Sequence, residues 1–513
     1  MRTFLALVLV LLFVAPSRLA AAERPNVLLA IADDWSYPHA SAYGCKFVST
    51  PTFDRIAREG VLFRQAFTAT PGCSPSRAAL LTGRHSWQLR AAGTHASSFP
   101  KDLAVFPNLL ESAGYFVGYC GKGWGPGSFK ITGWERNPCG PDFSVRLANP
   151  PAGIGNTDYA ASFDKFLKAR PDQQPFCFWY GGKEPHRAYA QGTGLRAGKR
   201  LEDAEVPPFL PATPAVRGDL LDYATEIEYF DAQLGKMLAS LERAGELDNT
   251  LVIVCSDNGM PFPRAKANLY EHGTHMPLAI RWPAKVKGGR TVDDLVGHVD
   301  LAPTILEASG VRQRPAGDAS ATGETNREAH ASRSPASMSG RSLLPTLLSD
   351  KSGLVDPSRT HVLMARERHS SSRPENLGYP SRAIRTAEYL YIRNFKPALW
   401  PAGDPQTADG KPAYHDIDDA PSKSLLVQGA DDPALQPFLA LAVAKRPAEE
   451  LFLLSADPAT IDNLADDPAH AAAKAKLRAE LNQYLTATED ARMTEKGDIW
   501  ETYPRYSPIR QFP

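Results

Sequence analysis

The sequence predicts an α/β fold, in which a mostly parallel sheet is flanked by helices and is followed by a smaller antiparallel sheet with a helix. Residues 26–32, 175–180 and 251–256 are continuous apolar runs, a pattern typical of parallel strands that are buried on both faces. Residues 50–60 and 219–244 have apolar positions at helical spacing, which predicts amphipathic helices. Together these segments predict the main sheet and the helices that cover it.

The chain divides into a short leader, a main domain and a C-terminal subdomain. We expect a signal peptide at residues 1–22, the main domain at 23–378, and an α+β subdomain at 379–513. Residues 312–341 contain almost no large apolar side chains, which predicts a disordered surface insertion. The apolar segment 361–366 is expected to return to the main sheet. The elements predicted for the subdomain are strands at 389–393 and 450–454 and a helix at 470–486.

Composition and the N-terminus exclude some classes of protein. The 57 basic and 57 acidic residues balance, so the charge gives no support for a nucleic-acid partner. A charge at Arg2, an apolar core at 4–14 and small residues at 19–22 predict a secretory signal peptide rather than a membrane span. No later stretch is long and apolar enough to span a membrane. Asn-x-Ser/Thr acceptor sites are absent, which fits a bacterial periplasmic or secreted protein better than a glycosylated one.

Pairs of oxygen-bearing side chains follow two of the predicted strands. Asp33 and Asp34 come directly after the first strand, and Asp257 and Asn258 follow the strand at 251–256. Open α/β sheets bind their ligands at the carboxyl ends of strands. A set of oxygen ligands suits Ca²⁺, with Mg²⁺ as second choice, and disfavours zinc. The alternative for either pair alone is a turn cap beside a solvated carboxylate.

The segment from Thr70 to His85 places a cysteine at the start of a predicted helix. Pro75 fits the first turn of a helix, so Cys73 would lie where free backbone N–H groups favour an anion. A lone cysteine is otherwise a small buried apolar residue. The six cysteines are too few for a disulfide scaffold, and a bridge between Cys120 and Cys139 stays open.

Cys73-Ser-Pro-Ser-Arg77, followed by Leu-Thr-Gly-Arg84, resembles the signature of the type I, formylglycine-dependent sulfatases. The resemblance implies an alkaline-phosphatase-like fold and a partner enzyme, formylglycine-generating or sulfatase-maturating, that oxidises Cys73 to formylglycine. The hydrate of that aldehyde would be the nucleophile. It also implies a Ca²⁺ ion held by Asp33, Asp34, the modified residue 73, Asp257 and Asn258.

Further segments resemble motifs of the same family. Gly121-Lys122, Pro185-His186 and the pattern of Lys266 followed by Tyr270-Glu271 occur in the expected order. The resemblance implies that Arg77, Lys122 and Lys266 are cations that bind the sulfate and the aldehyde. It also implies that His186 donates a proton to the leaving group.

One position departs from the family pattern. Where the family has a histidine two residues after the lysine, this chain has Trp124. That histidine helps to expel sulfate in the family, and His85 is our candidate to replace it. Glu367 and His369 follow the strand at 361–366 and are candidates to select the substrate at the pocket rim; the alternative is a solvated charged loop.

The segments 206–217, 256–263 and 379–386 resemble the heparan N-sulfatase (sulfamidase) branch of the family. The resemblance implies a sulfated saccharide as substrate and leaves N- and O-sulfate open. Two alternatives are a phosphate or phosphonate ester hydrolase of the alkaline phosphatase superfamily and a non-catalytic protein that binds sulfated glycans. The cysteine signature and the histidine-poor metal motifs argue against the first, and the intact set of charged residues argues against the second.

Overall fold

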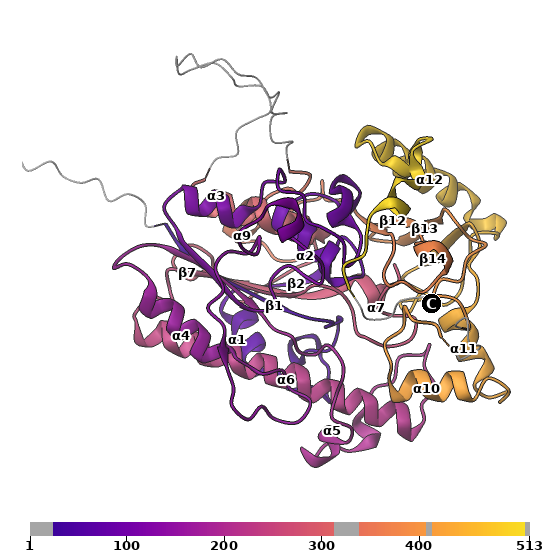
Figure 1. The fold of residues 1–513 in the computed structure, drawn as a ribbon, viewed down its shortest axis with the longest axis horizontal. Coiled ribbons are helices and arrows are strands. Elements are labelled where there is room, and N and C mark those ends of the chain that lie inside the picture. Colours follow the sequence, from indigo (N-terminus) through magenta and orange to yellow (C-terminus); the bar gives the residue numbers. More distant parts are fainter. Residues whose placement is uncertain (1–23, 312–337, 407–412, 508–513) are drawn as a thin grey trace, which may run out of the picture.

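The main sheet of the computed structural model has eight strands (Figure 1). The structure describes residues 24–311, 338–406 and 413–507. Along the sheet the strand order is β10-β2-β8-β7-β1-β6-β3, and β9 also pairs with β2. In chain order the strands are β1 (Asn26–Ala32), β2 (Val61–Phe67), β3 (Phe116–Gly121), β6 (Phe176–Gly181), β7 (Thr250–Ser256), β8 (His275–Arg281), β9 (Arg290–Val292) and β10 (Val296–Gly297).

Most neighbouring strands of this sheet are parallel. β1 lies between β6 and β7 and is parallel to both, and β3 is parallel to β6. β8 is the antiparallel member, paired with β7 and β2. The register pairs Ala32 with Ser256, so the carboxyl ends of β1 and β7 lie side by side. The predicted fold class is confirmed.

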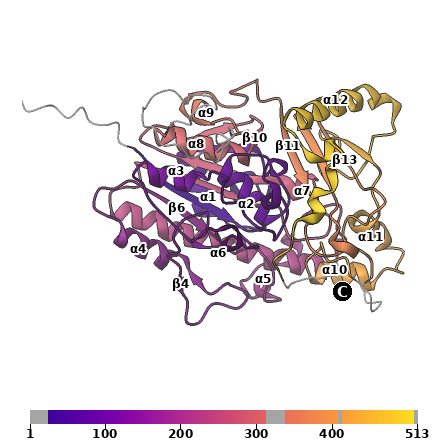
Figure 2. The ribbon, with the colours of Figure 1, turned by 45° about the horizontal axis from the view of Figure 1, so that its top comes forward.

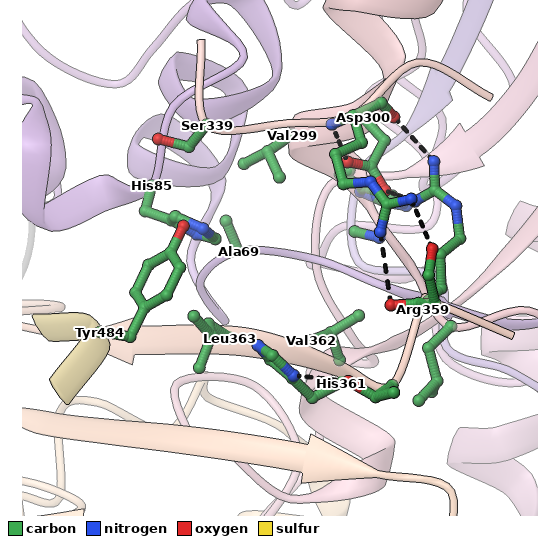
Figure 3. Close-up of a pocket in the computed structure, with 16 residues that line it drawn as sticks. Ala69, His85, Val299, Asp300, Ser339, Arg359, His361, Val362, Leu363 and Tyr484 are labelled. Atoms are coloured by element: carbon green, nitrogen blue, oxygen red, sulfur yellow. Dashed lines mark hydrogen bonds and ion pairs between the residues drawn. The ribbon is translucent and has the colours of Figure 1, made fainter. Parts of the chain in front are cut away.

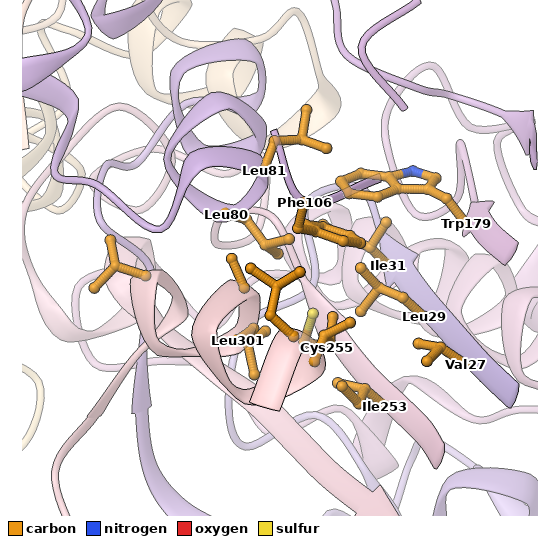
Figure 4. Packing of buried hydrophobic residues seen from close by; sticks show 14 of the residues in the cluster. Val27, Leu29, Ile31, Leu80, Leu81, Phe106, Trp179, Ile253, Cys255 and Leu301 are labelled. Carbon is orange, nitrogen blue, oxygen red and sulfur yellow. The ribbon is translucent and has the colours of Figure 1, made fainter. Parts of the chain in front are cut away.

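Helices cover both faces of the sheet, as the apolar composition of β1 requires. Val27, Leu29 and Ile31 point to the face where α2 and α3 pack (Figure 4), while the alternate residues of β1 pack on the face of α1, α4 and α6. This two-sided burial explains why the strand reads as a continuous apolar run. The helices of this part are α1 (Pro51–Glu59), α2 (Cys73–Thr82), α3 (Phe106–Ser112), α4 (Tyr159–Ala169), α5 (Thr193–Arg196), α6 (Pro214–Arg243), α7 (Glu271–Thr274), α8 (Leu301–Ala308) and α9 (Leu344–Leu348). A two-stranded ribbon is formed by β4 (Val145–Arg146) and β5 (Thr157–Asp158).

A four-stranded antiparallel sheet lies at one end of the main sheet, with α12 packed against it (Figure 2). Its order is β11-β12-β13-β14. The prediction that residues 361–366 return to the main sheet is wrong: they form β11, the edge of the smaller sheet. The elements are β11 (His361–Arg366), β12 (Ser381–Thr386), β13 (Tyr389–Asn394), β14 (Glu449–Leu453), α10 (Pro421–Gln428), α11 (Gln436–Val443) and α12 (Ala471–Ala487).

The two sheets are in direct contact. The backbone N–H of Ala365 in β11 donates to the carbonyl of Ala69 at 2.9 Å, just before α2 begins. Phe67 and Tyr270 of the main part share a buried apolar cluster with Met364 and Phe452 of the smaller sheet. Side chains that follow β11 are therefore carried toward the start of α2.

Some predictions fall outside the described residues. The signal peptide at 1–22 does so entirely, and so does the insertion from 312 to 337. Residues 338–341 of that insertion are placed in the structure, where Ser339 and Gly340 donate backbone hydrogen bonds to the Gly83 carbonyl. All six cysteines are free thiols, so Cys120 and Cys139 are not bridged. Among the described residues, no helix has both the length and the apolar character needed to cross a membrane.

Candidate active site

The predicted site lies at the carboxyl ends of β1 and β7, the two adjacent parallel strands at the centre of the main sheet. Asp33 and Asp34 follow β1 directly, and Asp257 and Asn258 follow β7. The four side chains are at most 1% exposed. Charged groups buried to this degree need partners or a bound cation.

Three carboxylates form a compact cluster. One oxygen each from Asp33, Asp34 and Asp257 lie within 4.8 Å of one another. Asn258 Nδ2 donates to Asp34 Oδ1 at 2.6 Å, and Asp257 Oδ1 accepts from the backbone N–H of Asp34 at 3.2 Å. Asp33 Oδ1 and Asn258 Oδ1 are buried and have no hydrogen-bond partner among the described residues. An all-oxygen set with two unpartnered oxygens fits a hard cation such as Ca²⁺.

The backbone at Asp34 is strained. Its φ is +77°, a conformation that is uncommon for a residue with a Cβ atom and that costs on the order of 1–3 kcal/mol. The neighbouring hydrogen bond to Asp257 holds the peptide in this orientation. Strain of this kind concentrates at functional sites, where surrounding contacts impose it.

The first turn of α2 faces the cluster. Cys73 is the first residue of the helix and is 2% exposed. Arg77 follows one turn later, and its Nε donates to Asp257 Oδ2 at 2.7 Å. Its Nη2 is buried and has no partner in the described part of the chain. Ser76 Oγ donates to the Asp257 carbonyl at 2.5 Å, which fixes the start of α2 against the end of β7.

Two lysines approach the carboxylates from different segments. Lys122 follows β3, where Gly121 adopts a φ of +71° that favours glycine, and its Nζ pairs with Asp33 Oδ2. Lys266 Nζ lies 2.7 Å from Asp34 Oδ2 and 3.1 Å from Asp418 Oδ2. The site therefore holds cationic and anionic groups in close balance.

His186 lies in the loop after β6 and turns one ring nitrogen toward the site. Its Nδ1–H donates to the Arg187 carbonyl at 2.5 Å, and its Nε2 lies 3.9 Å from Asp34 Oδ2. Arg187 forms a bidentate pair with Asp219 of α6 at 2.7 and 2.8 Å. This pair anchors the loop, and the His186 side chain remains 29% exposed.

Burial raises the pKa values of the three carboxyl groups in the cluster, and the neighbouring cations lower them. Burial is the largest influence on Asp34 and Asp257, and it raises the pKa of Asp34 to about 7 and that of Asp257 to about 6. Burial also acts on Asp33, but Lys122, His186 and Arg77 outweigh it and hold its pKa below the usual range. Burial raises the pKa of the Cys73 thiol, so a thiolate nucleophile is disfavoured.

Comparisons with known proteins agree with this geometry. A family model described as Sulfatase matches residues 25–311. The N-sulphoglucosamine sulphohydrolase of Homo sapiens is 31% identical over 503 residues, covering 92% of each chain. The chain belongs to the sulfatase family. An ulvan-active sulfatase of Formosa agariphila is 25% identical, over 92% of this chain and 77% of that protein. The predicted identity as a sulfatase, a hydrolase of sulfuric esters, is thereby confirmed.

Solved structures support the fold. One, in complex with its substrate D-glucosamine-2-N,6-O-disulfate, has a TM-score of 0.65 at 21% identity and covers 92% of this chain and 100% of that chain. A 2-O GAG sulfatase has a TM-score of 0.60 at 19% identity, with 95% and 99% covered. These likenesses extend over both sheets of the sulfatase.

The structure brings the principal predicted residues of this sulfatase together. Arg77, Lys122 and Lys266 each contact a carboxylate of the cluster, and His186 lies beside Asp34. Cys73 lies one helical turn before Arg77 in α2. Their individual chemical roles stay predictions.

The position that lacks the family histidine serves packing instead. Trp124 is 3% exposed, its Nε1 donates to the Ser74 carbonyl at 3.0 Å, and its ring lies edge-on to Phe99. The proposed substitute, His85, stacks on Trp87 with ring centroids 4.4 Å apart. It lines a cavity of about 270 Å³ together with residues such as His361 and Tyr484 (Figure 3), and Asp33, Asp34, Asp257 and Asn258 are not part of that lining. His85 is thus not brought to Cys73.

The two rim candidates lie in different surroundings. Glu367 is 5% exposed, and its carboxylate accepts from Arg382 at 2.8 Å and from Arg492 at 2.6 Å. These ion pairs tie β12 to the C-terminal segment, and a substrate role for Glu367 stays a prediction. His369 lies at the site: a Cβ built on Gly72, next to Cys73, would be 3.1 Å from its Nδ1.

Two residues at the site were missed by sequence reasoning. Asp418, on the segment before α10, reaches Lys266 and lies within 4.8 Å of His186 and Asp34. His95, between α2 and α3, places Nε2 3.3 Å from Cys73 Sγ. Neither belongs to a recognisable local motif. The absence of the family histidine at Trp124 was the one signal that a further imidazole was needed.

Proposed function

We propose that this sulfatase is an exported enzyme that hydrolyses sulfate esters or N-sulfate groups of sulfated glycans, using formylglycine made from Cys73 and a bound Ca²⁺ ion. The observation that carries the proposal is the grouping of Cys73 with Arg77, Lys122 and Lys266 around buried carboxylates. Such a set matches a substrate that carries a compact anionic group. Export rests on the predicted signal peptide at residues 1–22.

Asp33, Asp34, Asp257 and Asn258 would hold the ion through oxygen atoms. The two unpartnered oxygens, Asp33 Oδ1 and Asn258 Oδ1, support this assignment because Ca²⁺ takes six to eight oxygen ligands. Mg²⁺ is the second choice. When bound, the ion would supply positive charge that polarises a sulfate oxygen.

The cationic side chains would neutralise the remaining sulfate oxygens. Arg77 has a buried Nη2 without a partner among the described residues, so one N–H group is free to bind an anion. Lys122 and Lys266 already contact the cluster and can share their protons with a sulfate. Fixed positive groups in a site that excludes water stabilise developing negative charge strongly.

His186 would give its Nε2 proton to the departing oxygen or nitrogen. The Nδ1–H group of His186 donates to the Arg187 carbonyl. Nε2 is therefore the nitrogen that can donate a proton to the leaving group. Burial, followed by Lys266, lowers the pKa of His186 to about 4 in the free protein. A bound sulfate would raise that pKa, because a nearby negative charge favours the imidazolium form.

N-sulfated glucosamine is the leading candidate substrate. The human relative that spans 92% of this chain at 31% identity is named for N-sulphoglucosamine. The structural neighbour bound to D-glucosamine-2-N,6-O-disulfate supports the same class of sugar. Both concern other proteins, so a direct comparison of N- and O-sulfated saccharides is needed.

The test uses full-length protein from a host that matures sulfatases. The peptide spanning Cys73 should lose the mass difference between a CH₂SH and a CHO side chain, and the protein should release sulfate from N-sulfated glucosamine saccharides. We expect Cys73→Ala to reduce sulfate release to background. Cys45→Ala, at a buried thiol outside the site, serves as the matched control and should retain activity.

Other results would overturn parts of the proposal. Sulfate release by Cys73→Ala would exclude formylglycine as the nucleophile. Turnover of phosphate or phosphonate esters without sulfate release would move the protein to another hydrolase activity. Sulfate release from O-sulfated saccharides alone would replace the N-sulfate candidate.

A further inference from the structure

The nucleophilic position has a histidine neighbour that no family motif supplies. His95 Nε2 lies 3.3 Å from Cys73 Sγ. When Cys73 is oxidised, an oxygen atom takes the place of sulfur on the same Cβ atom. His95 therefore faces the atom at which the proposed reaction begins and ends.

Contacts on three sides hold His95 in this position. Its backbone N–H donates to the Arg368 carbonyl at 3.2 Å, and the next residue, Ala96, donates to Ser74 Oγ at 3.0 Å. Its ring packs against His369 with centroids 4.6 Å apart. The segment thus bridges the start of α2 and the loop after β11.

Among the described residues, Cys73 is the hydrogen-bond partner of the His95 imidazole. Nδ1 of His95 is buried and has no hydrogen-bond partner among the described residues. The hydrogen bond that the structure gives the ring is the one to Cys73. A ring kept only for packing would be served as well by an apolar side chain, without the cost of a buried unpartnered nitrogen.

Other groups near the site are committed elsewhere. The Trp124 indole donates to the Ser74 carbonyl, and Lys122 is paired with Asp33. His186 lies at Asp34, on the side of Lys266. His95, by contrast, forms its hydrogen bond with Cys73.

We propose that His95 is a catalytic residue that accepts the proton released at position 73 when sulfate is expelled. This inference rests on the proposed function and names the residue that takes over from the family histidine replaced by Trp124. In the step, the O–H proton of residue 73 passes to Nε2, and the O–H bonding pair forms the C=O bond. The C–O bond to sulfate breaks, and sulfate leaves with that bonding pair.

The contact can be tested without turnover. In protein made without maturation, which keeps the thiol, histidine is labelled with ¹⁵N and the imidazole nitrogens are observed by NMR. The Nε2 resonance of His95 is identified as the one that is missing from the spectrum of His95→Gln. Cys73→Ala should shift this resonance. An unchanged His95 resonance in Cys73→Ala would overturn the proposal.

The catalytic role is tested by single-turnover kinetics on matured protein. In His95→Gln the amide can fill the space of the ring but cannot accept the proton. We expect release of the desulfated saccharide within a few-fold of wild type, and release of free sulfate lowered by about 10²–10⁴-fold. Intact mass should show that the stalled variant has gained one SO₃ unit relative to its hydrated aldehyde form. His361→Gln, at an exposed ring of β11, is the control and should behave as wild type.

The outcomes separate the two proposals. Equal loss of saccharide and sulfate release in His95→Gln, or no loss of either, would overturn the role of His95 while wild type remains a sulfatase. Failure of the proposed function would appear as wild type that carries the aldehyde and releases no sulfate from any saccharide. In that case the role of His95 in sulfate release falls with it.

Discussion

Glu226 is a buried carboxyl group on α6 whose charge the fold does not accommodate. Its side chain is 2% exposed, and Oε2 has no partner among the described residues. Burial first, and then Glu184 and Asp222, raise its pKa from 4.5 to about 9. The pKa of Glu226 is therefore higher in the folded protein than in the unfolded chain. The folded state keeps its full stability below pH 4.5, and the free energy of unfolding falls as the pH rises toward 9.

We expect Glu226→Gln to stabilise the protein at neutral pH. The neutral amide removes the cost of holding a proton, so the free energy of unfolding at pH 7 should rise by up to about 3 kcal/mol. The gain should be smaller at pH 5 and larger at pH 9. Urea unfolding at the three pH values measures it, with Glu480→Gln on the surface of α12 as control. A gain that does not vary with pH would contradict the argument.

At the scale of single residues, the sequence could predict the groups that lie in local motifs. Cys73, Arg77 and the carboxylates after β1 and β7 occupy the expected positions because a strand end or a helix start fixes each of them. His95 and Asp418 could not be predicted, since their places depend on how distant loops fold back onto α2 and Lys266. Glu367 shows the reverse case: its position directly after the strand at 361–366 suggested a pocket rim, and in the structure two arginines bind its carboxylate.

At the scale of elements, the first turns of α6 position the loop that carries His186. Asp219 accepts both hydrogen bonds from the guanidinium of Arg187, and Arg187 is only 9% exposed. Asp219→Asn would leave a buried cation unpaired, which costs about 3–5 kcal/mol. We expect lower stability and also a fall in kcat of up to about 10²-fold, because His186 loses its fixed orientation.

The matched control for this element is Asp203→Asn. Asp203 pairs with Arg200 at an exposed site, where ion pairs contribute little, so its loss should change neither melting temperature nor kcat. Melting temperature and sulfate release are measured for both variants. If Asp219→Asn keeps the wild-type kcat, the pair stabilises the fold without positioning His186.

The elements themselves were predicted more reliably than their pairing. The strands β1, β6 and β7 and the helix α6 lie close to the expected bounds, because apolar runs and helical spacing are local properties. β11 was predicted as a strand but assigned to the wrong sheet. Periodicity predicts that a strand has a buried face, but it does not predict which strand lies beside it. In the structure β11 pairs with β12, which in turn pairs with β13.

At the scale of the whole molecule, the carboxylate cluster joins parts that are distant in the chain. It draws on the ends of β1 and β7, and Lys266 connects it to Asp418 near α10. An ion bound there would join the carboxyl ends of β1 and β7, which are more than 200 residues apart in the chain. Its binding should therefore change the stability of the complete fold, because a ligand that binds only the folded state stabilises all of it.

We expect removal of Ca²⁺ by a chelator to lower the melting temperature, and by more at pH 8 than at pH 5. Without the ion, Asp34 and Asp257 have pKa values raised to about 7 and about 6, so the folded protein holds protons that an ion must displace. Protonation of Asp34 and Asp257 stabilises the ion-free fold at low pH, and this stabilisation is lost as the pH passes 6 to 7. Above that pH the two carboxylates are charged, and a bound ion stabilises the fold instead. Free Ca²⁺ at a hundred times its dissociation constant would contribute about 2.7 kcal/mol. Thermal unfolding of wild type and Asp257→Asn, with chelator and with added Ca²⁺, measures the difference. An equal Ca²⁺ effect in both proteins would place the ion away from this cluster.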